Sequence, residues 1–106
     1  MLSLPKNPAM SDFQNYVNQL ELERGFTKQT GLQKCLLLGE EMGELFKAIR
    51  KYDSALRIDS NSKVGTIEEE LADILIYISA IANRYKIDLE QAFRKKEEQN
   101  KTRVWK

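Results

Sequence analysis

The 106-residue chain is long enough for one domain and too short for two. Its formal net charge of +1 provides no strong attraction to nucleic acid or to a membrane surface, and 31% charged residues are typical of a globular protein. The single cysteine, Cys35, lies in an apolar run, so it is expected to be buried, no disulfide can form within the chain, and a cytoplasmic location is expected. No apolar run approaches the roughly 20 residues of a membrane span, so no membrane partner is expected.

The chain contains no histidine. This absence removes the commonest general base and the usual ligand of zinc and iron. Any metal chemistry in this protein must therefore depend on carboxylates.

Apolar spacing predicts a first helix after an N-terminal arm at residues 1–10. The helix is expected from about Ser11 to Arg24, with Ser11 or Asp12 as its N-cap and Gly25 at its end. Residues 11–106 are predicted to form one helical domain.

The second helix is expected from about Thr30 to Tyr52, and the polar stretch at 53–63 predicts an irregular loop. The third helix should follow Thr66, which has Glu69 three residues later as in a capping box.

That third helix is expected to continue to about Tyr85, and a fourth should run from an Asp88 cap to about Asn100. Strand-like alternation is nowhere sustained, so the expected class is all-α, a four-helix, bundle-like single domain.

The third predicted helix is apolar around much of its circumference. The apolar residues of this segment are Ile67, Leu71, Ala72, Ile74, Leu75, Ile76, Ile78, Ile81 and Tyr85. A helix of this kind must be covered on several sides, and a chain this short has few residues to cover it. We therefore expect a homodimer or a homotetramer.

Two acidic pairs stand out on the second and third helices, Glu41 with Glu44 and Glu70 with Asp73. Side chains three residues apart on a helix point to similar sides. Apolar residues flank both pairs, which indicates that the acids face the interior of the bundle. Each pair alone is more often an ordinary solvated face, but two pairs framed in this way favour a site.

Inward-facing carboxylates repel one another and lose hydration, and a divalent cation would relieve both costs. Ligand sets made only of oxygen favour Mg²⁺, with Mn²⁺ as a substitute. The sequence thus predicts a magnesium site at Glu41, Glu44, Glu70 and Asp73.

Three segments resemble the MazG-type, all-α nucleoside triphosphate pyrophosphohydrolases, and together they cover most of the chain. They are EEMGELFKAIRK, EEELADILIYISAIANRYKIDLEQAF and KKEEQNKTRVW. The family pattern of EExxE, then ExxD, then Lys and Asn is met by Glu40, Glu41 and Glu44, by Glu70 and Asp73, and by Lys96 and Asn100.

The resemblance implies Mg²⁺-dependent hydrolysis of nucleoside triphosphates, including dNTPs, to the monophosphate and pyrophosphate. It implies nucleotide pool cleaning as the role, subunit contacts near the sites, and substrate contacts at Tyr77, Lys96 and Asn100. Glu41 and Glu44 are the candidate catalytic carboxylates. The only tryptophan is Trp105, whereas some relatives carry tryptophans near the base, so the pattern does not specify how the base is recognised.

Other functions remain as alternatives. A non-catalytic helical interaction module would use the same acids only in salt bridges. A di-iron carboxylate bundle usually needs Glu-x-x-His motifs, which a chain without histidine cannot supply. Stable nucleic-acid binding is not expected, because only the last dozen residues are basic and they include Glu97 and Glu98.

Overall fold

The computed structural model describes residues 2–53, 61 and 63–104. Four helices make up the regular structure of this part of the chain, and it contains no strand. They are α1 (Met10–Arg24), α2 (Gly31–Asp53), α3 (Ile67–Arg84) and α4 (Leu89–Lys101). The all-α class with four helices is confirmed.

Local capping explains where several helices begin and end. Gly25, with a φ of 77°, ends α1 in the left-handed conformation that glycine adopts without strain. Thr30 and Gln33 form a reciprocal capping box at the start of α2, with hydrogen bonds of 3.1 and 2.9 Å. The Thr66 hydroxyl accepts from the Glu69 amide at 3.1 Å, as predicted.

Helix α1 begins one residue earlier than predicted, and its N-cap lies two or three residues before the predicted caps. Ala9 is the N-cap, and Asp12 is the third helical residue rather than the cap. The Asp12 carboxylate accepts from the Ala9 amide at 2.7 Å, so it stabilises the helix start from inside the first turn.

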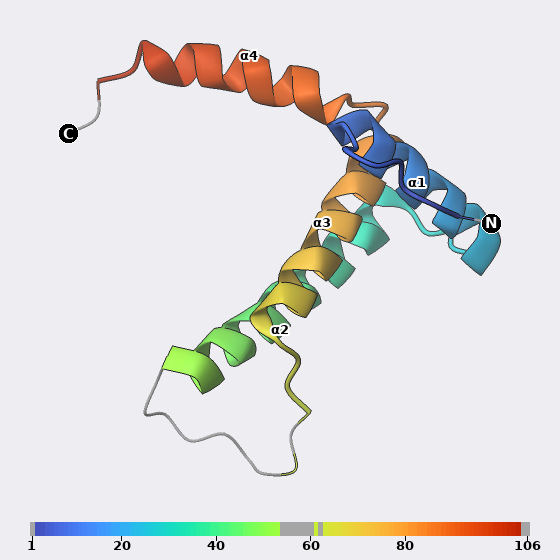
Figure 1. Ribbon diagram of the computed structural model, residues 1–106, viewed down its shortest axis with the longest axis vertical. Coiled ribbons are helices and arrows are strands. Elements are labelled where there is room, and N and C mark those ends of the chain that lie inside the picture. The colour runs from blue at the N-terminus through green and yellow to red at the C-terminus, as the bar shows by residue number, and fades with distance from the viewer. Residues whose placement is uncertain (1, 54–60, 62, 105–106) are drawn as a thin grey trace.

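Helix α3 is the centre of the fold. It packs against α2 along much of its length and against α1 near its C-terminal end, whereas α4 departs from the other helices (Figure 1). A small core of Val17, Leu20 and Ala80 joins α1 to α3. Leu2 packs against this core and so connects the N-terminal arm to it.

Large apolar residues are exposed on α2, α3 and α4. They include Leu32, Leu36, Phe46, Leu71, Ile78 and Phe93. Cys35 is also exposed, so the expectation that it belongs to the core was wrong. Within the described part of the chain, no helix combines the length and apolar character that crossing a membrane requires.

Candidate functional site

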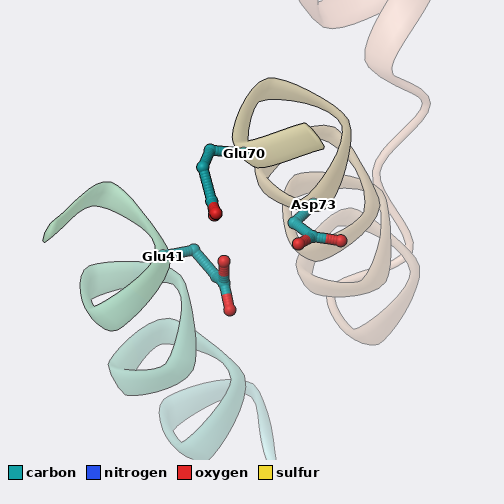
Figure 2. Close-up of side chains that lie close together, drawn as sticks. All are labelled: Glu41, Glu70 and Asp73. Atoms are coloured by element: carbon teal, nitrogen blue, oxygen red, sulfur yellow. The ribbon is translucent and has the colours of Figure 1, made fainter. Parts of the chain in front are cut away.

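Three carboxylates from two helices meet between α2 and α3. Glu41 comes from α2, and Glu70 and Asp73 come from α3 (Figure 2). Each offers one oxygen, and these oxygens lie within 4.8 Å of one another. Glu70 is buried, Glu41 is partly buried and Asp73 is exposed, so the cluster opens to solvent on one side. We call these three residues the acid cluster.

The beginning of α3 holds Glu70 in place. Its amide donates to the Thr66 carbonyl at 3.1 Å, within the turn that the Thr66 hydroxyl caps. Gly65 lies directly beside the Glu70 carboxylate, where a Cβ on residue 65 would collide with it. Asp73 lies three residues further along the helix, so it shares a side of α3 with Glu70.

The electrostatics of the acid cluster are unfavourable without a cation. Burial raises the pKa of Glu41, and its hydrogen bond to Glu70 and the nearby charges of Asp73, Glu70 and Glu44 raise it further. Three converging carboxylate oxygens form a donor set that suits a hard divalent cation. The residues present therefore fit a metal ion such as Mg²⁺.

Glu44 lies near the acid cluster without joining it. Its partly exposed carboxylate lies 3.9 Å from the Lys47 ammonium, one turn along α2. Three of the four predicted metal ligands are thus brought together, and the role of Glu44 as a ligand stays a prediction. Glu40 is exposed on the same helix.

Tyr77 lies one turn beyond Asp73 on α3. Burial raises the pKa of its hydroxyl, and the charges of Glu41, Asp73 and Glu40 raise it further. It lines a cavity of about 130 Å³ between α1, α2 and α3, and Asp73 lines the same cavity. The cavity therefore adjoins the acid cluster, because Asp73 belongs to both.

A buried ion cluster of Glu21, Lys34 and Arg84, two of which line this cavity, was not predicted. Glu21 is 2% exposed, and its carboxylate accepts two hydrogen bonds from Arg84, at 2.7 and 2.6 Å. The Lys34 ammonium lies 3.1 Å from the same carboxylate. Lys34 is on α2 and its anionic partner is on α1, so no pattern within one helix pairs them. The sequence contained one indication of a buried charge, since Glu21 follows Val17 and Leu20 on the apolar side of α1.

Comparison with known proteins identifies the fold and the family. The model of the MazG nucleotide pyrophosphohydrolase domain matches residues 29–104. The chain belongs to this family.

A MazG-family crystal structure, that of iMazG from Vibrio DAT 722, is similar with a TM-score of 0.62 and 31% identity. The match covers 89% of this chain and 99% of that one. The dCTP pyrophosphatase 1 of Bos taurus is 30% identical over 105 residues, which are 95% of this chain. The chain spans 62% of the length of that relative.

The last two residues of the MazG pattern, Lys96 and Asn100, lie on α4. Within one chain α4 runs away from the pair of helices that carries the acid cluster (Figure 1). Lys96 and Asn100 instead line an apolar groove with Leu75 and Ile78 of α3. The structure thus does not bring them to the cluster within one subunit, and their contact with substrate stays a prediction.

Proposed function

We propose that the chain hydrolyses nucleoside triphosphates, including dNTPs, to the monophosphate and pyrophosphate, and that it cleans the cytoplasmic nucleotide pool. The observation that carries the proposal is the convergence of Glu41, Glu70 and Asp73 within 4.8 Å, on two helices of a MazG domain. The name of the bovine relative, a dCTP pyrophosphatase, supports a deoxynucleotide substrate.

The acid cluster would hold Mg²⁺, with Mn²⁺ as a substitute, and Glu44 would add a fourth carboxylate. When bound, the cation acts as a Lewis acid on phosphate oxygens and makes a water molecule more acidic. The chain itself contributes a fixed arrangement of acids on two capped helices. Because those helices pack along their length, the ligands are positioned before substrate arrives.

The hydrolytic step needs a proton acceptor next to the attacking water. Glu41 or Glu44 would take this proton. The water oxygen bonds to the α-phosphorus while the bond from that phosphorus to the α–β bridging oxygen breaks. Pyrophosphate leaves with the bridging oxygen, and Lys96 would stabilise its charge.

A second subunit would complete this site. None of the residues of α4 is buried in the single chain, and Phe93 is 72% exposed. Helix α4 of a partner, packed on the exposed apolar residues of α2 and α3, would bring Lys96 and Asn100 to the acid cluster. We expect a homodimer or homotetramer, and light scattering that shows a stable monomer at micromolar concentration would contradict this assembly.

The decisive experiment measures pyrophosphate release from all canonical and several damaged triphosphates, with and without Mg²⁺. Release that depends on Mg²⁺ is the expected result. Absence of turnover with every triphosphate would refute the enzyme and favour the non-catalytic interaction module.

A further inference from the structure

A lysine contributes to the lining of the cavity beside the acid cluster. Its lining includes Phe26 from the loop after α1, Lys34 from α2, and Asp73 and Tyr77 from α3. The Lys34 ammonium lies 4.9 Å from the centre of the Phe26 ring and 5.4 Å from that of Tyr77. Two aromatic rings and one buried ammonium thus lie together in the lining of the cavity.

The charges of the buried ion cluster do not balance. Arg84 already donates to both oxygens of the Glu21 carboxylate, which neutralises one negative charge with one positive charge. Lys34 adds a second positive charge beside the same carboxylate, although its side chain is only 4% exposed. A buried ammonium with three donors and a shared anionic partner retains capacity to donate to an acceptor in the cavity.

The position of Lys34 along α2 determines which part of a nucleotide reaches it. Lys34 precedes Glu41 by seven residues, a rise of about 10 Å along the helix. The phosphates of a substrate must lie at the acid cluster, since the cluster is the proposed metal site. The part that extends to Lys34 is therefore the edge of the base that lies furthest from the sugar.

We propose that Lys34 determines base specificity, by donating a hydrogen bond to a carbonyl oxygen at that distant edge. The proposal rests on the proposed function and names its substrate class: 4-keto pyrimidines and 6-keto purines, selected over their amino counterparts. An amino group at the same position presents donors to the ammonium instead of an acceptor. A preference for keto bases would disfavour dCTP, because cytosine carries an amino group at the edge that faces Lys34.

The test is equilibrium binding of four deoxynucleoside monophosphates in the presence of Mg²⁺, measured by calorimetry. The uracil and cytosine nucleotides form one pair, and the hypoxanthine and adenine nucleotides form the other. Each pair exchanges a carbonyl for an amino group. Wild-type protein should bind the keto member about tenfold more tightly or better, as expected for a hydrogen bond to a charged donor.

Lys34→Met should reduce both ratios to about one, while Lys28→Met, a change at an exposed lysine of the loop before α2, should leave them unchanged. A wild-type protein without the keto preference overturns the inference whatever the variants do, and so does an unchanged ratio in folded Lys34→Met.

Binding of monophosphates requires no turnover, so the two proposals can fail separately. Keto preference without pyrophosphate release would refute only the enzyme. Triphosphate hydrolysis without keto preference would refute only the role of Lys34.

Discussion

Two buried glutamates of this protein have opposite surroundings. Glu21 on α1 is 2% exposed, and two cations contact its carboxylate. Glu70 on α3 is 8% exposed, and its carboxylate faces those of Glu41 and Asp73. In the first arrangement cations balance the carboxylate, whereas in the second the neighbouring groups are like charges, which a bound cation would neutralise. Burial of a charge therefore says little about function until the signs of its neighbours are known.

The pKa values show the same contrast. Burial raises the pKa of Glu21, but hydrogen bonds and attraction from Arg84 and Lys34 outweigh it and leave the pKa lowered. Glu41 in the acid cluster is also desolvated, and there every neighbouring charge adds to the increase of its pKa. Substitutions at Glu21 and in the acid cluster should therefore separate a role in stability from a role in catalysis.

The largest effect should follow from Glu70→Gln. The change removes one negative charge from the proposed metal site, so Mg²⁺ binding should weaken and turnover should fall by about 10²-fold or more, an effect comparable to the loss of one key electrostatic group in an active site. Isothermal titration of Mg²⁺ and pyrophosphate release measure the two quantities. Glu68→Gln, an exposed neighbour on α3, is the control and should change neither. If Glu70→Gln kept full Mg²⁺-dependent activity, the acid cluster would not be the metal site, and the interaction module would become the better explanation.

Glu21→Gln should instead reduce stability. It leaves the buried Lys34 and the partly buried Arg84 without their anion, which typically costs about 3–5 kcal/mol of unfolding free energy. Urea unfolding followed by circular dichroism measures the loss. The exposed Glu23→Gln on the same helix should stay within about 0.5 kcal/mol of wild type. Equal stability of the two variants would show that the buried ion cluster does not stabilise the fold.

Acid should weaken the same interaction. The pKa of Glu21 is lower in the folded protein than the ordinary value of 4.5, so its contribution to stability is complete above that value. The contribution is lost as the pH falls from about 4.5 through the lower folded pKa, because the unfolded chain takes up the proton first. Unfolding free energies measured from pH 7 to pH 3 should therefore fall more steeply for wild type than for Glu21→Gln. Parallel curves for the two proteins would contradict the lowered pKa.

Local patterns predicted the parts of this fold that depend on neighbours in sequence. Gly25, Thr66 and Asp88 end or cap their helices because the groups involved lie within a few residues. The sequence also predicted that Glu41 faces Glu70 and Asp73, because apolar residues flank the acids on both helices.

Features that depend on long-range packing were not predictable. Arg84 meets Glu21 across 63 residues of sequence, which no local pattern encodes. Glu44 lies outside the group of converging oxygens because residues three apart differ by about 60° in direction around the helix axis, and its role as a ligand stays a prediction. Of two acids spaced in this way, one can reach the acid cluster while the other points to its side. The motif places Lys96 and Asn100 on α4. It does not determine where α4 packs, and therefore not what these two side chains contact.

The smallest effect, and the most selective, should come from Gly65→Ala. The new methyl group would press on the Glu70 carboxylate without removing any charge, and the flexible end of that side chain can move aside. Displacing Glu70 from its preferred rotamer should cost about 1 kcal/mol of Mg²⁺ binding, or roughly fivefold in affinity. The fold should persist, because the collision involves a side-chain terminus rather than backbone. Gly39→Ala on α2 is the matched control, since nothing lies within 4 Å of its added Cβ, and it should leave Mg²⁺ affinity unchanged. If Gly65→Ala lowered the unfolding free energy but not the Mg²⁺ affinity, Glu70 would belong with Glu21 among the stabilising charges, and the contrast between the two regions would fail.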